Sequence, residues 1–311
     1  RMKASHPQVS YKEFPMVVLV TGATGLIGKR VCKRLIALNH QVIAVTRTPR
    51  DSHQPGLSYL VGDLNSAPLQ SEDLNKIEAV VHLAGESIAG RWTRTKKESV
   101  LNSRVQGTKN LLDSFPENNQ LKVWIGASAI GFYGHREDEE LTESCLPGTG
   151  FLSEVTTAWE QAQKAVQARI PLRQALFRIG IVLAKDGGAL PLMARPIAMG
   201  VGSCLGDGRQ WMSWIHIDDL VELVCESLTQ PTYEGVFNAV APEPLRHREF
   251  MKLLAQTLNR WLLPSVPASM IKIGLGEMSS LVLDSQKVKS RVPYSFRYPK
   301  LEMALKHLYQ K

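Results

Sequence analysis

Short apolar runs alternate with longer amphipathic stretches along the first 240 residues of this chain. The runs are typical of strands that are buried on both faces of a parallel sheet. They lie at 17–20, 41–46, 57–61, 79–83, 121–127, 172–178 and 235–240. Apolar residues recur at helical spacing over 26–38, 95–115 and 151–168. This alternation predicts an α/β fold with a doubly wound parallel sheet of Rossmann type.

The pattern changes around the last of these strands. Residues 184–208 are rich in Gly and Pro, which predicts a loop and a short apolar helix that cover the carboxyl edge of the sheet as a substrate lid. After Pro242 the sequence predicts helices joined by Pro-rich loops. The helices are expected at 246–259, 271–288 and 300–308, with a hinge at 264–269.

These changes in pattern suggest two structural units. We expect a nucleotide-binding domain over 16–184, to which 209–241 returns, and a smaller, mostly helical substrate-binding lobe made of 185–208 and 242–311. Asp218 is expected to cap a helix that begins at the next residue.

Three glycines follow the first strand in the segment T-G-A-T-G-L-I-G. Gly22 allows a sharp turn, Gly25 lets backbone N–H groups approach a phosphate, and Gly28 lets the helix pack closely against the strand. Because the glycines lie between a strand and a helix N-terminus, they predict a dinucleotide site rather than an ordinary Gly-rich turn. The expected cofactor contacts from this loop are Gly22, Thr24, Gly25, Leu26, Ile27 and Gly28.

The end of the second strand indicates which dinucleotide binds. An NAD site would carry an Asp or Glu there for the ribose hydroxyls, but this chain has Thr46 and no acid before Asp51. Arg47 and Arg50 have planar guanidinium groups that suit a 2′-phosphate. The alternative is two exposed loop arginines. We expect NADP, with NAD less favoured.

The spacing G-x-x-G-x-x-G resembles the short-chain dehydrogenase/reductase superfamily, in particular its extended, epimerase-like members. The resemblance implies that the G-D-L segment lines the adenine pocket and that H-L-A-G-E lies against the ribose and pyrophosphate. It also implies that the R-I-G after strand 172–178 flanks the nicotinamide. The residues assigned in this way are Asp63, Leu64, Leu83, Ala84, Gly85, Arg178 and Gly180. His82 is expected to be a packed strand residue, and Trp159 a packing residue of its helix.

The catalytic pair of that superfamily is missing from this sequence. Ser128 and Tyr133 resemble the family's serine and Tyr-Gly, although they stand five residues apart rather than four. The resemblance then implies Y-x-x-x-K on the next helix, but matching Glu160 puts Leu152 at the Tyr position and Thr156 at the Lys position. No Y-x-x-x-K occurs anywhere in the chain.

Further segments narrow the resemblance. They include S-A-I-G-F-Y-G, R-I-G-I-V-L-A-K-D-G-G-A-L, W-M-S-W-I-H-I-D-D-L and the C-terminal P-Y-S-F-R-Y-P-K-L-E-M-A-L. Together they resemble an atypical group of epimerase family proteins that carry a C-terminal domain of unknown function. Members of that group commonly lack the Tyr and Lys. The resemblance therefore implies fold and NADP binding more directly than it implies any reaction.

Composition and charge exclude several classes of function. The formal net charge is +8, but the cations are scattered without a basic run or an aromatic-interleaved basic patch, so we expect no nucleic-acid partner. No run of 18 uncharged apolar residues predicts a membrane span. The polar start, with Lys3, His6 and Lys12, predicts no signal peptide. The four cysteines form no C-x-x-C pair, which predicts a reducing, cytoplasmic location and no metal site.

Two function hypotheses follow from these observations. The first is an NADP-dependent oxidoreductase or epimerase acting on a carbonyl or sugar-like small molecule, with Ser128 orienting the substrate and Tyr133 or Glu86 supplying the proton. Glu154 and His135 are further candidates for the proton. The second is a non-catalytic NADP(H)-binding sensor. The resemblance also implies a homodimer formed through helices such as 95–115 and 151–168.

Overall fold

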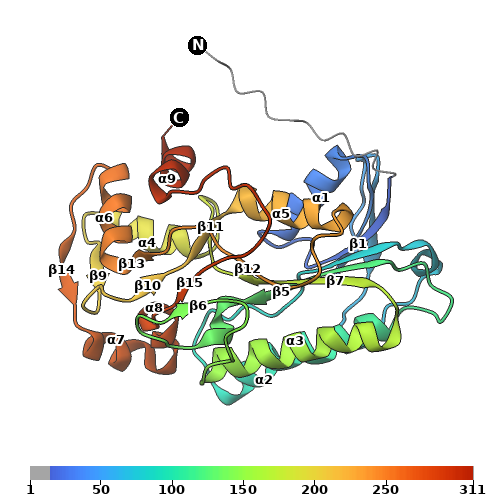
Figure 1. Ribbon diagram of the computed structural model, residues 1–311, viewed down its shortest axis with the longest axis horizontal. Coiled ribbons are helices and arrows are strands. Elements are labelled where there is room, and N and C mark those ends of the chain that lie inside the picture. The colour runs from blue at the N-terminus through green and yellow to red at the C-terminus, as the bar shows by residue number, and fades with distance from the viewer. Residues whose placement is uncertain (1–14, 311) are drawn as a thin grey trace, which may run out of the picture.

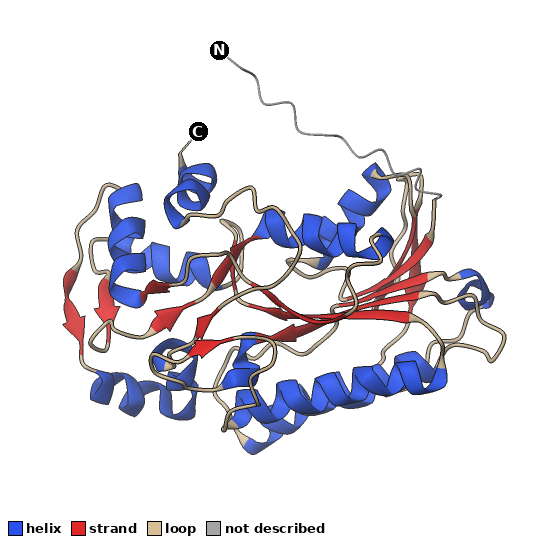
Figure 2. Cartoon of the chain, in the orientation of Figure 1, coloured by secondary structure: helices blue, strands red, loops and turns tan. Residues whose placement is uncertain are grey.

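The computed structural model describes residues 15–310 of the 311-residue chain. The polar N-terminal segment with Lys3, His6 and Lys12, on which the signal-peptide prediction rests, lies outside the described residues. Within residues 15–310, no helix is both long and apolar enough to cross a lipid bilayer. A large central sheet has helices on both of its faces (Figures 1 and 2).

The central sheet has seven strands, and every pairing between neighbours is parallel. The strand order is β3-β2-β1-β4-β5-β7-β12, which reverses between β1 and β4. This order confirms the predicted doubly wound sheet and puts its topological switch point beside the glycine-rich turn. The strands are β1 (Val17–Thr21), β2 (Gln41–Thr46), β3 (Leu57–Val61), β4 (Ala79–His82), β5 (Val123–Ala129), β7 (Arg173–Ile179) and β12 (Gly235–Ala239).

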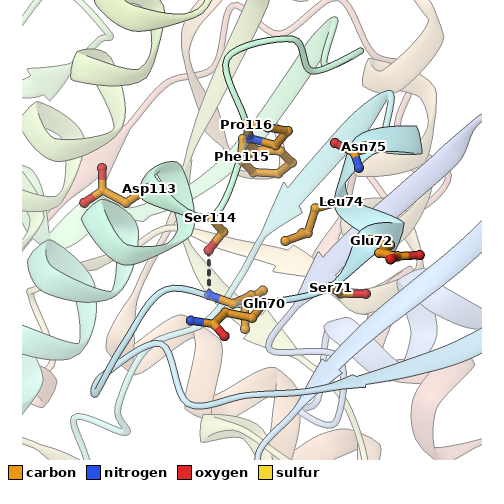
Figure 3. A pocket seen from close by; sticks show the side chains of 10 residues that line it. Gln70, Ser71, Glu72, Leu74, Asn75, Asp113, Ser114, Phe115 and Pro116 are labelled. Atoms are coloured by element: carbon orange, nitrogen blue, oxygen red, sulfur yellow. Dashed lines mark hydrogen bonds between the residues drawn. The ribbon is translucent and has the colours of Figure 1, made fainter.

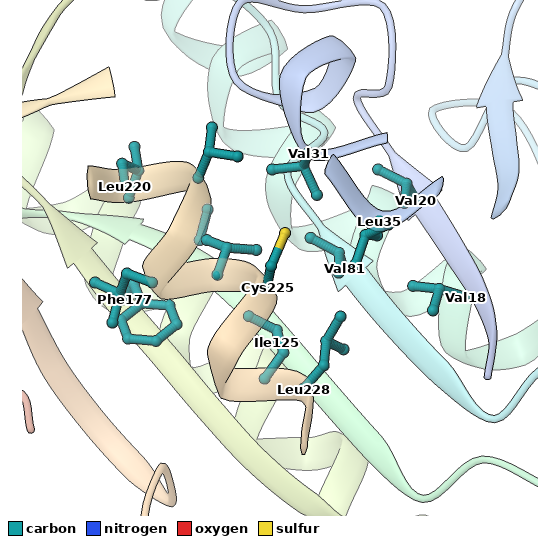
Figure 4. Packing of buried hydrophobic residues seen from close by; sticks show 14 of the residues in the cluster. Val18, Val20, Val31, Leu35, Val81, Ile125, Phe177, Leu220, Cys225 and Leu228 are labelled. Carbon is teal, nitrogen blue, oxygen red and sulfur yellow. The ribbon is translucent and has the colours of Figure 1, made fainter. Parts of the chain in front are cut away.

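Two pairs of helices cover the sheet. Helices α1 (Gly28–Ala37) and α5 (Ile217–Thr229) lie on one face, and α2 (Arg94–Asp113) and α3 (Phe151–Arg169) lie on the other (Figure 1). Alternate strand residues enter the two cores, because successive side chains of a strand point to opposite faces. Val18 and Val20 pack with α1 and α5 (Figure 4), whereas Leu19 packs on the side of α2 and α3.

Two helix starts differ from the sequence prediction. Helix α1 begins at Gly28 rather than at residue 26, because the chain is still turning through Leu26 and Ile27. Helix α5 is capped by His216 rather than by Asp218: the His216 Nδ1 atom accepts the Asp218 backbone N–H at 3.0 Å. The capping residue is therefore two positions earlier in the sequence than the predicted Asp218.

A second cluster of elements lies beyond the carboxyl ends of the strands, on the left in Figure 1. Its apolar core is formed by α4 (Ala189–Ala198), α6 (His247–Thr257) and α9 (Leu301–Tyr309), through residues such as Leu190, Phe250 and Leu305. The remaining short elements are η1 (Glu72–Lys76), η2 (Ile130–Tyr133), β6 (Glu140–Leu141), β8 (Ile181–Leu183), β9 (Ser203–Leu205), β10 (Trp211–Met212), β11 (Trp214–His216), β13 (Leu245–Arg246), β14 (Leu263–Val266), α7 (Ala268–Leu275), η3 (Gly276–Ser279), α8 (Ser280–Leu283) and β15 (Lys287–Val288).

The single helix predicted over 271–288 is wrong. Helix α7 ends at Leu275. Gly276 follows it with a φ of 56° that L-residues rarely adopt, and Asp284 takes up an extended conformation before β15. The Pro-rich segment predicted as a hinge overlaps β14, which pairs in parallel with β9, and the start of α7. These pieces are too short for a sequence pattern to separate them from loop.

Polar contacts join the C-terminal segment to α5. The buried Asp219 carboxylate accepts hydrogen bonds from the Tyr294 hydroxyl and from the backbone N–H groups of Arg297 and Tyr298, at 2.8–3.1 Å. The rings of His216 and His307 meet through Nε2 and Nδ1 at 3.1 Å. The H-I-D-D segment therefore anchors the end of the chain as well as starting α5.

Candidate functional site

A cavity of about 250 Å³ lies at the carboxyl ends of β1, β2, β3 and β4. This is the edge at which doubly wound sheets bind ligands, next to the switch point between β1 and β4. The lining residues are Thr21, Gly22, Thr24, Gly25, Val45, Thr46, Arg47, Gly62, Asp63, Leu64, Asn65, His82, Leu83, Ala84, Gly85, Glu86, Ser103 and Gly107.

The glycine loop is shaped by close backbone contacts. Gly22 has a φ of 66°, and a Cβ atom there would lie 2.8 Å from the Leu83 carbonyl group. A Cβ atom on Gly28 would lie 2.2 Å from the Gly22 oxygen, so any side chain would push α1 away from the loop. A Cβ atom on Gly25 would meet only the Gly22 oxygen, so its other side is open to the cavity. This cradle of bare backbone beside a helix N-terminus fits a pyrophosphate group.

An uncharged chain of side chains holds the end of β4 against β1. The Thr21 hydroxyl accepts the N–H groups of Leu83 and Ala84, so its own hydrogen points to Nδ1 of His82. The other ring nitrogen of His82 bonds the Thr108 hydroxyl, which itself donates to a helix carbonyl. His82 is therefore neutral with its proton on Nε2. Burial, aided by the charge of Arg104, lowers the pKa of His82 to about 3.

One of the two predicted arginines lies at the cavity. Arg47 and Arg50 are both exposed, but Arg47, directly after β2, lines the cavity and Arg50 does not. The Thr46 hydroxyl donates to the Thr48 carbonyl, so the strand ends in a turn without a carboxylate. Across the cavity, the Asp63 carboxylate is engaged by the N–H of Asn65 and the hydroxyl of Ser66.

Glu86 is the one predicted catalytic residue that lines the cavity. Its N–H donates to Ser103 Oγ, and its carboxylate accepts a hydrogen bond from Lys96 Nζ at 2.9 Å. The Lys96 hydrogen bond holds the pKa of Glu86 below its usual range, so the carboxyl group is ionised at neutral pH. Glu86 is therefore equipped to accept a proton or a hydrogen bond rather than to act as an acid.

Ser128 and Tyr133 belong to a buried network around an ion pair. The Glu160 carboxylate accepts hydrogen bonds from Ser128 Oγ at 2.7 Å and from Arg178 Nε and Nη2 at 2.7 and 2.9 Å. Tyr133 has no exposed surface, and its hydroxyl contacts Arg178 and Asn238. Desolvation raises the pKa of Tyr133. Both hydroxyl groups are thus committed within the protein.

Helix α3 presents no acid or base at the two positions of the missing pair. Leu152 packs against the backbone at Gly131, and the Thr156 hydroxyl donates back to the Leu152 carbonyl. Glu154, which lies between these two positions in the sequence, is exposed. His135 is distant in the fold, where its Nδ1 atom accepts the N–H of Ser285.

The structure brings together most, but not all, of the predicted cofactor residues. The lining set includes Gly22, Thr24, Gly25, Arg47, Asp63, Leu64, Leu83, Ala84 and Gly85. It does not include Leu26, Ile27, Gly28, Arg50, Arg178 and Gly180. Leu26 packs at Gly187, and a Cβ atom on Gly180 would lie 2.8 Å from the Ser213 oxygen, so both residues make close contacts within the protein. The sequence analysis did not predict that Ser103 and Gly107 line the cavity. The small side chains at these two positions of their helix were the only indication in the sequence.

Two other features of the described residues were compared with this cavity as candidate sites: a surface depression and a cluster of potential metal ligands. A shallow depression of about 530 Å³ lies between η1 and the end of α2, with Leu74, Phe115 and Pro116 on its walls (Figure 3). It lies where β4 and β5 begin, which is the opposite edge of the sheet from the switch point. His216, Asp218 and His307 have potential metal-ligand atoms within 4.8 Å of one another, but hydrogen bonds occupy both nitrogens of His216.

Comparisons with known proteins agree with this geometry. A model of the NAD dependent epimerase/dehydratase family matches residues 18–239, and a domain of unknown function, DUF1731, matches residues 266–308. The chain is 38% identical over 320 residues to the chloroplastic epimerase family protein SDR39U1 homolog of Arabidopsis thaliana, covering 97% of this chain and 89% of the relative. It is 37% identical to the epimerase family protein SSP1921 of Staphylococcus saprophyticus, covering 93% and 98%.

Two solved structures are similar to the whole fold. Human epimerase family protein SDR39U1, solved with NADPH, has 32% identity and a TM-score of 0.82, covering 95% of this chain and all of that one. A nucleoside-diphosphate sugar epimerase from Corynebacterium glutamicum has 32% identity and a TM-score of 0.76, covering 95% of this chain and 58% of its own. The sheet, the glycine cradle and these matches agree, and the chain belongs to the NAD dependent epimerase/dehydratase family.

Proposed function

We propose that this protein binds NADP(H) in the carboxyl-edge cavity and uses it as a redox cofactor with a carbonyl or sugar-like small molecule. The observation that carries the proposal is Arg47, which lines the cavity after β2 where an NAD site would hold an acidic residue. A guanidinium group binds a phosphate through paired, charge-assisted hydrogen bonds. The human relative solved with NADPH supports this choice of cofactor.

The roles of the chain's own residues follow from their positions. Gly22 and Gly25, with the start of α1, would hold the pyrophosphate, and Arg47 would bind the 2′-phosphate. When bound, the cofactor supplies a hydride donor or acceptor at its nicotinamide ring. Glu86, which its hydrogen bond from Lys96 keeps ionised, would accept a proton or a hydrogen bond from a hydroxyl group of the substrate. Ser128 and Tyr133 are the other proposed catalytic residues. Their hydroxyl groups already have partners within the protein, which a substrate would have to replace.

The cofactor proposal is tested by calorimetric titration with NADPH and NADH. Arg47→Ala should weaken NADPH binding about ten- to a hundredfold and leave NADH binding nearly unchanged, because it removes a charged hydrogen bond to the 2′-phosphate alone. Arg94→Ala, at an exposed position outside the cavity, is the control and should bind as the wild type does. The same titration of Arg50→Ala shows whether Arg50 also contributes to NADPH affinity. Equal loss of both cofactors in Arg47→Ala would contradict the assignment.

A non-catalytic sensor is the second candidate function. The observation in its favour is that the hydroxyl groups of Ser128 and Tyr133 are bonded to Glu160, Arg178 and Asn238 rather than free for a substrate. A panel of carbonyl compounds, followed by NADPH absorbance at 340 nm, separates the two functions. Turnover of any member supports the enzyme. Cofactor binding without turnover, accompanied by slower hydrogen exchange in 184–208 and 266–308, supports the sensor.

A further inference from the structure

Arg104 is a cation on α2 that lies next to the cavity without being part of the predicted site. Its Nη1 atom donates to the carbonyl oxygens of Glu86 and Val100 at 3.0 and 3.1 Å. The guanidinium group lies over the ring of Trp159, 5.0 Å from the ring centroid. A Cβ atom on Gly85 would lie only 2.9 Å from Cζ of Arg104. The missing side chain at Gly85 therefore makes room for this guanidinium group.

Arg104 has no ion-pair partner in the part of the chain that the structure describes. No carboxylate of residues 15–310 lies within ion-pair distance of it, and the nearby Glu86 carboxylate, which is paired with Lys96, acts on Arg104 only through its charge at longer range. Desolvation lowers the pKa of Arg104 to about 10, so the group stays charged at neutral pH. A partly desolvated cation without an ion-pair partner is costly, which favours an external anion as its partner.

Part of the guanidinium fork is free to make that contact. Within residues 15–310, Nε and Nη2 of Arg104 make no hydrogen bond, and neither is a buried unsatisfied atom, so solvent or a ligand can reach them. Both lie within 3.3 Å of where a Cβ on Gly85 would stand, and Gly85 lines the cavity. These donors suit a phosphate oxygen.

We propose that Arg104 binds the pyrophosphate of the dinucleotide, an inference that rests on the proposed function. The sheet order decides between the cofactor's phosphates. Arg47 follows β2, the glycine loop follows β1 and Gly85 follows β4, and these three strands are neighbours in the order β2-β1-β4. A dinucleotide with its 2′-phosphate at Arg47 and its pyrophosphate over the glycine loop therefore presents the pyrophosphate, not the 2′-phosphate, to Arg104.

The test compares NADPH with adenosine 2′-monophosphate, which keeps the 2′-phosphate but lacks both phosphates of the pyrophosphate. Arg104→Gln should weaken NADPH binding about ten- to a hundredfold and binding of the monophosphate by less than about threefold. Arg47→Gln should weaken both ligands. Arg104→Lys keeps the charge without the fork and should restore part of the NADPH affinity. The ligand-free melting temperature of each variant shows whether the loop at Glu86 has survived.

Each outcome decides a separate point. Unchanged NADPH affinity in Arg104→Gln, or equal losses for NADPH and adenosine 2′-monophosphate in a variant that folds, would overturn the role of Arg104 and leave the proposed function standing. If Arg104→Gln fails to fold, Arg104→Lys carries the test, and NADPH affinity equal to the wild type at both low and high salt would overturn the role. Absence of NADPH binding to the wild-type protein would instead contradict the proposed function.

Discussion

The buried pair Arg178–Glu160 contacts Ser128 and Tyr133, the two residues for which the sequence resemblance implied a catalytic role. Arg178 and Glu160 are 4% and 2% exposed, and the pair holds the hydroxyl groups of Ser128 and Tyr133 in one network. From the sequence we assigned functional roles to Ser128, Tyr133 and Arg178. Glu160 served only to match its helix to the family's motif. Their mutual contacts join residues 18 to 45 positions apart, which local patterns do not report.

Removing the charge of Glu160 should be strongly destabilising. In Glu160→Gln, the amide would turn an NH₂ group toward donors of Arg178 and leave a buried cation unpaired, at a cost of about 3 kcal/mol or more. Urea unfolding measures this difference. The matched control is Glu98→Gln, which removes the partner of the exposed Arg94 and should cost less than about 0.5 kcal/mol. Similar losses in the two variants would contradict the account.

Helix α5 shows which elements a sequence pattern resolves. A helix beginning at Asp219 was predicted, but its cap was assigned to Asp218 instead of His216 because the ring nitrogen of a histidine is a rare capping group. The role of Asp219 in holding the C-terminal segment was also missed. Its partners lie 75–79 residues further along the chain, where the predicted helix at 271–288 proved to be several short pieces.

Asp219→Asn should loosen the C-terminal segment without unfolding the sheet. The amide replaces a charged acceptor of two backbone N–H groups, so the hydrogen-exchange protection at Arg297 and Tyr298 should fall about ten- to a hundredfold. Asp218→Asn is the control, because the structure assigns no backbone N–H of this segment to Asp218. Equal loss of protection in both variants would show that Asp219 is not the anchor.

At the scale of the whole molecule, the strand and helix alternation was enough to predict the layers and the parallel sheet. The glycine-rich turn located the cavity, because carboxyl ends of parallel strands meet at one edge. The short strand pairs beyond that edge were not predictable, since elements of two to four residues carry no period. Three of the buried histidines, His82 in the sheet and His216 and His247 beyond it, should make both regions sensitive to acid.

Stability should fall as the pH drops below about 6.5. Burial lowers the pKa of His82 to about 3 and those of His216 and His247 to about 4, so below pH 6.5 the unfolded chain binds protons that the folded chain does not. Each histidine contributes a slope of up to about 1.4 kcal/mol per pH unit. Urea unfolding between pH 7.5 and 5 measures the total.

Two variants show whether buried histidines cause this dependence of the free energy of unfolding on pH. His247→Gln should reduce it by the share of one histidine, whereas the exposed His53→Gln should leave it unchanged. A free energy of unfolding that stays constant or rises from pH 7.5 to 5 would contradict the burial account.

The most direct measurement of the central claim is the ratio of NADPH to NADH affinity for the unmodified protein. Because a 2′-phosphate facing Arg47 adds a charged hydrogen bond, NADPH should bind at least about tenfold more tightly than NADH. Equal affinities would contradict the role of Arg47, and binding of neither cofactor would contradict the assignment of the cavity itself.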